Sequence, residues 1–291
     1  MKTKLWVHLV VLPRWFGLPV CVSAVVLGGI IAGAGTFELF LAVIAGVLLM
    51  SAAHSWNSFH DYTITGFDKG PEEERSISKA YTRGQSLIAA GVVSEREVFL
   101  NALGWLLLSL VPVVLLSLWA TPWVWLPWGL SVVCSPWYSE AKKLFHPEVP
   151  LGLGFGPFAV MLGAATITDP PLWTAFLAGL PIAVVFGVVA ETTDQFEDWE
   201  VNWEKGLRNM GAVAGANRLD LSAFLGHLVL ATYVVQGAIA LAGVLVPLTF
   251  LSLLALPLFW YCMLYLATAH KKAILLGLSG VFLFCILLAV G

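Results

Sequence analysis

Charged residues are scarce in this 291-residue chain. Asp, Glu, Lys and Arg make up 11% of it, whereas soluble domains carry about 25%. Hydrophobic residues make up 59%, which is more apolar sequence than a soluble core of this size requires. The composition therefore excludes an ordinary soluble protein and predicts an all-α, polytopic protein surrounded by membrane lipid. The net charge of −3 and the lack of a basic run give no reason to expect a nucleic-acid partner.

Cysteine is also rare, and its spacing excludes two common uses. The four cysteines lie in apolar stretches, and no CxxC pair occurs. We therefore interpret them as small buried hydrophobic residues rather than as zinc ligands or disulfides. The N-terminal segment shows no clear small-residue cleavage site, so we expect it not to be a cleavable signal. The cysteines are Cys21, Cys134, Cys262 and Cys285.

Long apolar runs are abundant. Runs of about 20 residues are typical of membrane-spanning helices, and nine candidates are present. Two polar loops are long, at about 58–97 and 194–218, and they follow the second and sixth candidates. This placement predicts one domain over 1–291, with two similar four-helix halves at about 15–139 and 151–267 plus a ninth helix. The predicted spans are about 15–34, 37–57, 98–119, 122–139, 151–168, 172–193, 219–242, 245–267 and 273–290.

Basic residues are missing from one side of the predicted bundle. With nine spans, all fifteen Lys and Arg residues fall on one side, and the opposite loops carry only Glu38 and Asp169 among charged residues. The side rich in Lys and Arg is usually cytoplasmic. We therefore expect a multi-pass protein of the cell membrane. Its N-terminus, both long loops and its active site would face the cytoplasm, and its C-terminus would lie outside.

The few carboxylates gather where apolar spans end. Asn57 and Asp61 are four residues apart at the end of the second span. Asp194 and Asp198 repeat this spacing at the end of the sixth. Side chains at i and i+4 share one helix face, with Cβ atoms about 5–6 Å apart, and ionisable groups at membrane depth are functional-site candidates. Two such faces, with Asp68 from the following loop, predict a site for Mg²⁺, which prefers carboxylate and substrate phosphate oxygens.

A cluster of carboxylates at a membrane boundary suits a ligand with an apolar chain and an anionic head group. An isoprenyl diphosphate has both, and Mg²⁺ can neutralise the diphosphate as it leaves. Cationic side chains can stabilise the same charge, and aromatic ring faces can stabilise the allylic cation that remains. One candidate, Arg14, could instead be a positive-inside anchor. The candidate diphosphate-binding residues are Arg14, Lys69, Arg83, Lys142, Lys205 and Arg208.

The two acidic motifs, their places and the span count together resemble the UbiA superfamily of intramembrane prenyltransferases, which has nine transmembrane helices. The resemblance covers essentially the whole chain. It implies Mg²⁺-dependent transfer of an isoprenyl chain from its diphosphate to a lipophilic or aromatic acceptor, with two Mg²⁺ ions bridging the diphosphate. Tyr138-xxx-Lys142 is similar to the family's segment after helix 4, which implies that both side chains contact the diphosphate or shape the acceptor pocket. The implied catalytic residues are Asp61, Asp198, Lys142 and Tyr138.

Finer features resemble the 1,4-dihydroxy-2-naphthoate prenyltransferase branch. They are the segments Gly66-Phe67-Asp68, Arg83-Gly84-Gln85-Ser86, Gly91-Val92-Val93-Ser94 and Phe155-Gly156-Pro157. This resemblance implies an aromatic quinone precursor as the acceptor. The chain departs from the family at Ser58, where Asp is common, and at Asn202, where the second motif usually has a third Asp. Whether Glu191, Glu197 or Asn202 completes the second metal site is left open.

Two other functions remain as alternatives. A geranylgeranylglyceryl phosphate prenyltransferase for archaeal ether lipids would share the chemistry but bind an acceptor with its own phosphate. A transporter would need broken helices and charges within its spans, whereas the charges here lie at span ends. His54, inside the second span, is expected to hydrogen-bond a neighbouring helix, and His60 is expected to be a polar interface residue rather than a metal ligand.

Overall fold

The computed structural model describes residues 2–67, 87–88, 91–144, 147–196, 199–266 and 268–291, and all regular secondary structure in these ranges is helical. The first half contains α1 (Lys2–Trp6), η1 (Val7–Val11), η2 (Trp15–Gly17), α2 (Leu18–Ala32), α3 (Thr36–Phe59), η3 (His60–Ile64), α6 (Glu95–Trp119), η4 (Pro122–Val124) and α7 (Trp125–Ala141). The second half contains α8 (Glu148–Leu153), η5 (Gly154–Phe158), α9 (Ala159–Ala164), α10 (Leu172–Ala178), α11 (Leu180–Ile182), η6 (Ala183–Ala190), α12 (Glu191–Gln195), α13 (Trp199–Glu204), α14 (Met210–Ala216), α15 (Leu221–Leu241), η7 (Pro247–Ala255), α16 (Leu256–Leu266) and α17 (His270–Val290).

Seven helical stretches in the described residues are long and apolar enough to cross a membrane. They coincide with seven of the nine predicted spans, and the first begins earlier than predicted, at Lys4. The other two predicted spans, 122–139 and 151–168, are helical as well, but α7 has 17 residues and the α8–α9 stretch, Glu148–Ala164, is also short. The prediction of an all-α polytopic bundle is therefore confirmed, with seven candidate spans rather than nine.

Local sequence explains where several of these helices begin. Ser94 caps α6, since its hydroxyl accepts a hydrogen bond from the Glu97 amide while the Glu97 carboxylate accepts from the Ser94 amide. The Asp220 carboxylate caps α15 in the same manner, accepting from two backbone amides. Lys4 pairs with Glu97 at 3.0 Å, which holds the N-terminal segment against the start of α6.

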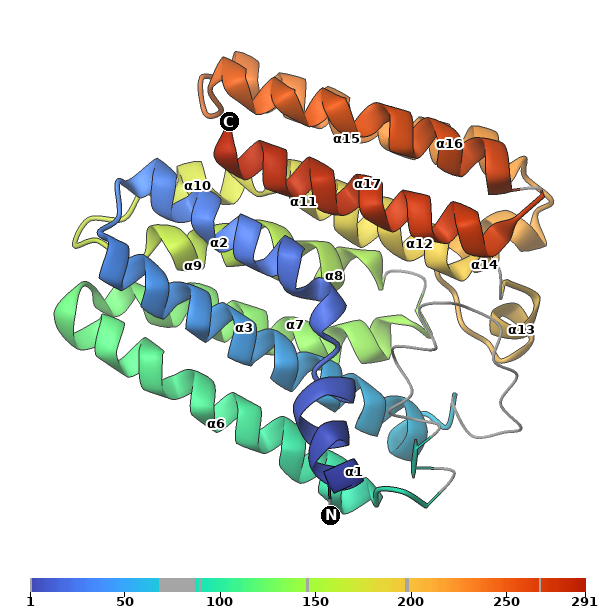
Figure 1. Cartoon of the computed structure of the whole chain (residues 1–291), viewed down its shortest axis with the longest axis horizontal. Helices are drawn as coiled ribbons and strands as arrows, with labels where there is room; N and C mark the ends of the chain where they lie inside the picture. Colours follow the sequence, from blue (N-terminus) through green and yellow to red (C-terminus); the bar gives the residue numbers. More distant parts are fainter. Residues whose placement is uncertain (1, 68–86, 89–90, 145–146, 197–198, 267) are drawn as a thin grey trace.

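Close backbone contacts tie the helices of the bundle together. Figure 1 shows α6, α3, α2 and α17 side by side, and each pair of neighbours in this row is in contact. Helices α2 and α9 approach so closely that a side chain at Gly28 would overlap the Val160 carbonyl, and one at Gly163 would overlap the Val25 carbonyl. Small residues allow such contacts between membrane helices, where packing rather than the hydrophobic effect drives association.

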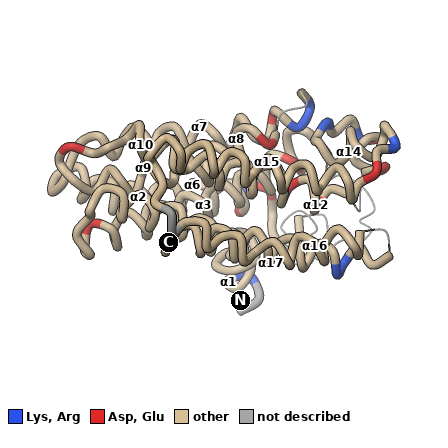
Figure 2. Tube along the Cα trace, turned by 90° about the horizontal axis from the view of Figure 1, so that it is seen from above, with Lys and Arg blue, Asp and Glu red and all other residues tan. Residues whose placement is uncertain are grey.

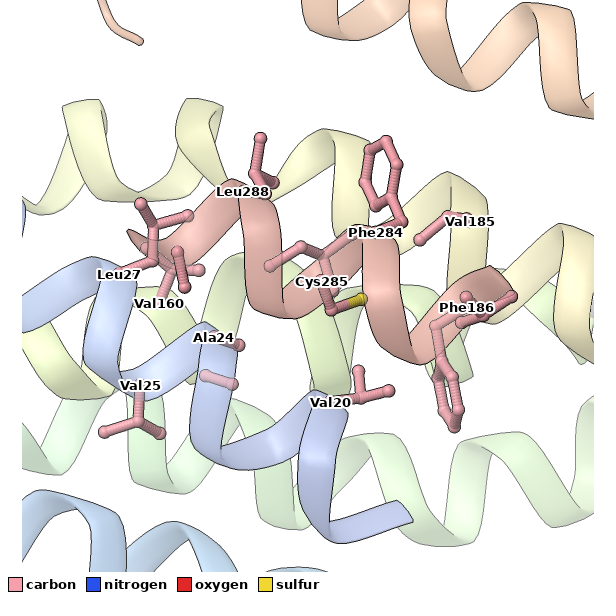
Figure 3. Packing of buried hydrophobic residues seen from close by; sticks show 14 of the residues in the cluster. Val20, Ala24, Val25, Leu27, Val160, Val185, Phe186, Phe284, Cys285 and Leu288 are labelled. Atoms are coloured by element: carbon pink, nitrogen blue, oxygen red, sulfur yellow. The ribbon is translucent and has the colours of Figure 1, made fainter. Parts of the chain in front are cut away.

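The hydrophobic core lies between the first and last long helices. In Figure 3, Val20 and Ala24 of α2 face Cys285 of α17, and Val185 and Phe186 of η6 lie beside them. Cys285 is fully buried, and all four cysteines are free and buried, as predicted. The core therefore packs α17, at the end of the chain, against α2, near its start.

Charges are distributed unevenly along the bundle. Figure 2 shows Lys and Arg confined to the half that carries α12 and α14, while only acidic residues mark the opposite end. The C-terminus lies at the end away from α12 and α14 (Figure 1). This distribution matches the segregation predicted from the sequence. Which side of the membrane this end faces stays a prediction.

Candidate active site

The Asn57–Asp61 face, which the sequence predicts as half of a metal site, is buried and holds a lysine. Asn57 and Asp61 are 6% and 3% exposed and lie on consecutive turns at the end of α3. The Lys142 ammonium, from the end of α7, donates a hydrogen bond to Asn57 Oδ1 at 2.8 Å and forms an ion pair with Asp61 Oδ2. Ser139 donates to the same Asn57 oxygen at 3.4 Å. This face therefore already binds a cation, in the form of an ammonium group.

The same face also fits a divalent cation. Asp61 Oδ1 is buried and accepts no hydrogen bond within the described part of the chain. A buried acceptor left in this state costs about 1–3 kcal/mol, and a bound metal ion would satisfy it. Among the described residues, no three His, Cys, Asp or Glu side chains gather closely enough to hold a metal. The predicted ligands Asp68 and Asp198 lie outside the described residues, so their part in the cage stays a prediction.

A chain of hydrogen bonds organises the second acidic face. Tyr138 on α7 donates to Glu191 Oε1 at 3.0 Å, and Gln195 donates to the same oxygen at 3.5 Å. Asn202 on α13 in turn donates to Gln195 Oε1. Glu191 and Asp194 both lie in α12, and Asp194, Glu148 and Lys142 all act electrostatically on Glu191. The structure therefore places Glu191 beside the predicted ligand Asp194, whereas the Asn202 amide is engaged with Gln195.

Tyr138 lies where the two acidic faces meet. Its ring is 4.6 Å from the Lys142 ammonium, and Asp61, Glu191 and Arg14 all act electrostatically on its hydroxyl. The Arg14 backbone adopts a left-handed conformation, with φ of 52°, and its guanidinium donates to Ser58 Oγ at 3.1 Å. Arg14 lies more than a hundred positions from Tyr138 and Lys142 in the sequence. All three side chains nevertheless converge on the Asn57–Asp61 face.

Two further predicted cations lie on the loop after α13. Lys205 is exposed and donates to the Phe67 carbonyl at 2.8 Å, which brings it next to the segment that follows η3. The Arg208 amide donates to the Lys142 carbonyl at 2.8 Å, while its guanidinium stacks 4.0 Å above the Trp203 ring. The structure therefore places Arg208 beside Lys142 through its backbone. The predicted cations Lys69 and Arg83, and the alternative ligand Glu197, lie outside the described residues.

Sequence reasoning missed two features of this region. First, π-helical segments adjoin both acidic faces: η3 begins at His60, and η6 ends directly before Glu191. Such segments are frequent at functional sites, but no sequence pattern predicts them. Second, Glu148 is 3% exposed and accepts a hydrogen bond from the Met210 amide at the start of α14. The sequence also predicted His60 as a polar interface residue, and in the structure its Nε2 lies 2.9 Å from Glu140 Oε1.

An acidic and cationic site at one end of an all-helical membrane bundle suits a substrate that has an apolar chain and an anionic head. The UbiA prenyltransferase family matches residues 18–288, nearly the whole chain. The chain therefore belongs to the UbiA prenyltransferase family, and it is a prenyltransferase. This confirms the predicted family and enzyme class, and it removes the transporter alternative. No match was found among curated proteins.

Solved structures of the family share the fold. An apo UbiA homologue from Aeropyrum pernix K1 has a TM-score of 0.69 at 18% identity, over 94% of this chain and 97% of that one. A UbiA homologue from Archaeoglobus fulgidus bound to GPP and Mg²⁺ has a TM-score of 0.61 at 15% identity, over 98% and 99%. A digeranylgeranylglyceryl phosphate synthase structure has a TM-score of 0.59 at 16% identity, over 99% and 96%. At these identities the similarity establishes the fold and leaves the acceptor open.

Proposed function

We propose that this protein transfers an isoprenyl chain from an isoprenyl diphosphate to an aromatic quinone precursor, in a Mg²⁺-dependent reaction within the membrane. The observation that carries the proposal is the buried Asn57–Asp61 face, which has one carboxylate oxygen available to a cation and Lys142 beside it. The A. fulgidus homologue was solved with GPP or with DMAPP, each together with Mg²⁺. We infer that the present chain binds the same pair of ligands.

The residues divide into those that hold the metal and those that hold the diphosphate. Bound Mg²⁺ would neutralise the charge that develops on the leaving diphosphate. Lys142 and Arg14 would bind the diphosphate oxygens, and Tyr138, whose ring lies 4.6 Å from the Lys142 ammonium, would help to orient it. The proposed metal ligands are Asn57, Asp61, Asp68, Asp194 and Asp198. The proposed diphosphate-binding residues are Arg14, Lys69, Arg83, Lys142, Lys205 and Arg208.

The bond changes follow from this placement. The bond between C1 of the isoprenyl chain and the diphosphate oxygen breaks, and its electron pair leaves with the diphosphate. A π bond of the acceptor ring then attacks C1, and the ring carbon that formed the new bond loses its proton to water. Holding the ring against C1 can contribute about 7–11 kcal/mol to lowering the barrier, because the two reactants no longer have to meet by diffusion.

A group of rings around His54, which precedes Asn57 and Asp61 on α3, supports an aromatic acceptor. The Phe155 ring, from η5, lies 4.5 Å from the Phe186 ring of η6 and 6.0 Å from the His54 ring of α3. The Phe16 ring also lies 5.8 Å from the His54 ring. Ring faces suit a planar acceptor, and they can also stabilise the allylic cation. We therefore infer that the acceptor ring binds among these side chains, with the diphosphate at the Asn57–Asp61 face.

The orientation in the membrane is part of the same proposal. The end of the bundle that carries Lys and Arg (Figure 2) would face the cytoplasm, following the positive-inside tendency. Isoprenyl diphosphates, which carry a charged head, would then enter from the aqueous side while their chains remain in lipid.

An acceptor panel tests the proposal. The purified protein in lipid nanodiscs is incubated with Mg²⁺, radiolabelled geranylgeranyl diphosphate and, in parallel, dihydroxynaphthoate, hydroxybenzoate or geranylgeranylglyceryl phosphate. We expect a prenylated dihydroxynaphthoate. Product from the glyceryl phosphate alone would show that the assigned branch is wrong and that the alternative lipid acceptor is correct, while the reaction class would stand.

A further inference from the structure

His54 lies on the same face of α3 as the proposed metal ligands. Asn57 follows it by three residues and Asp61 by seven, which is the spacing of side chains that stack along one side of a helix. At a rise of about 1.5 Å per residue, His54 lies roughly 10 Å deeper along the helix than Asp61. The distance between His54 and the position proposed for the metal is therefore similar to the length of a diphosphate group.

The imidazole nitrogen Nε2 of His54 is buried and has no hydrogen-bond partner within the described residues. The rings of Phe16 and Phe155 lie 5.8 and 6.0 Å from the imidazole, Met50 lies close to Gly17 in the same region, and Arg14 is near enough to interact electrostatically with the ring. Residue 17 is glycine, and a Cβ added there would come within 3.4 Å of Nε2. A histidine whose only task was packing would be better replaced by an apolar residue, because a buried polar atom without a partner is costly.

The backbone of His54 is tied to the diphosphate side of the site. Ser58 Oγ donates to the His54 carbonyl at 3.2 Å and accepts a hydrogen bond from Arg14 at 3.1 Å. These two hydrogen bonds link the helix backbone at His54 to Arg14 and to the turn that carries Asn57. A group held by Nε2 would have a defined distance from C1 of an isoprenyl diphosphate bound at that face.

We propose that His54 is an acceptor-binding residue, which accepts a hydrogen bond at Nε2 from a hydroxyl group of the aromatic acceptor. This inference rests on the proposed function and narrows it to hydroxylated aromatic acceptors. The rings of Phe16 and Phe155 flank the acceptor's apolar plane, while Nε2 fixes its rotation. Ring rotation determines which ring carbon faces C1, so His54 would set both the affinity for the acceptor and the position of prenylation.

Two substitutions of His54 separate hydrogen bonding from packing. His54→Phe keeps a ring and removes the nitrogen, whereas His54→Gln keeps a polar group that can hydrogen-bond. The probe is dihydroxynaphthoate, with geranylgeranyl diphosphate and Mg²⁺ in lipid nanodiscs. We expect His54→Phe to raise the acceptor KM about tenfold or more, the usual effect of losing a buried hydrogen bond. The KM for geranylgeranyl diphosphate should stay within about twofold, and His54→Gln should recover part of the acceptor affinity.

Two further variants complete the design. His227→Phe is the matched control, since His227 is exposed on α15 and hydrogen-bonds its own helix; it should behave as wild type. Gly17→Ala is the second probe, because Gly17 has an ordinary φ of −74° and the added methyl would lie beside Nε2. It should raise the acceptor KM without altering His54, which keeps the test valid if His54→Phe does not fold.

The outcomes distinguish this inference from the proposed function. If wild-type protein prenylates none of the hydroxylated aromatic acceptors, the proposed function fails and this inference fails with it. If wild-type protein prenylates dihydroxynaphthoate but His54→Phe and Gly17→Ala leave the acceptor KM unchanged, the inference about His54 alone is overturned. An equal loss of affinity for both substrates would show a structural role for His54 and would likewise overturn it.

Discussion

Replacing Lys142 by methionine removes one half of a buried ion pair. The side chains of Lys142 and Asp61 are 13% and 5% exposed, and the ammonium also hydrogen-bonds Asn57. Removing one partner of such a pair typically costs about 3–5 kcal/mol, because the remaining charge is left buried without a counter-ion. We expect Lys142→Met to lose stability of about this size in metal-free buffer, where Asp61 has no other described partner for its charge.

Magnesium should reverse much of this loss. In wild-type protein an incoming Mg²⁺ ion must compete with the ammonium for Asn57 and Asp61, whereas in Lys142→Met these oxygens are available. A ligand present at about 100 times its Kd stabilises a folded protein by about 2.7 kcal/mol. Added Mg²⁺ should therefore raise the unfolding temperature of Lys142→Met by more than it raises that of wild-type protein.

Thermal unfolding in detergent, followed by intrinsic fluorescence with EDTA or with Mg²⁺, measures both effects. Lys143→Met is the matched control, because its side chain is 44% exposed and lies 3.6 Å from an exposed Glu140 carboxylate. It should unfold as wild-type protein does under both conditions. The reasoning would be refuted if Lys142→Met unfolded at the wild-type temperature in EDTA, or if Mg²⁺ shifted both proteins equally.

Three further predictions concern the rest of the site. Asp61→Ala and Asp198→Ala should each abolish prenyl transfer while the protein still folds, as checked by product analysis and size-exclusion chromatography; near-normal turnover in either would contradict the metal cage. Arg208→Ala should lower kcat/KM for the isoprenyl diphosphate by about 10²–10³, the usual effect of removing one group that stabilises developing charge. Glu148→Gln should lower the free energy of unfolding by about 1.5–3 kcal/mol, because it weakens a charge-assisted hydrogen bond from the Met210 amide. The KM for the diphosphate should not change, which serves as the control.

Features that depend on local spacing could be predicted from the sequence. The i, i+4 pair Asn57 and Asp61 lies on one buried face as expected, because helical periodicity fixes which side chains share a side. The long apolar runs also predicted most of the spans. The two predicted spans outside the seven are helical but short: α7 has 17 residues, and the α8–α9 stretch contains the π-helical segment η5.

Features that depend on contacts between distant segments could not be predicted. The sequence indicated that Lys142 binds a diphosphate, but not that its ammonium reaches Asn57 and Asp61 from another helix. The Tyr138–Glu191 hydrogen bond likewise joins residues 53 positions apart. The sequence predicts a hydrogen bond from His54 to a neighbouring helix, and its spacing places it on the same helix face as Asn57 and Asp61. Only the structure showed that its Nε2 is buried among aromatic rings.

The requirement for a divalent cation tests the central claim most directly. Purified protein in nanodiscs is incubated with radiolabelled isoprenyl diphosphate and an acceptor that it prenylates, first in EDTA and then after Mg²⁺ is restored in excess. If the carboxylates at the ends of the two helices form a metal site for the diphosphate, product will be absent in EDTA and will appear when Mg²⁺ returns. Undiminished transfer in EDTA would contradict the account.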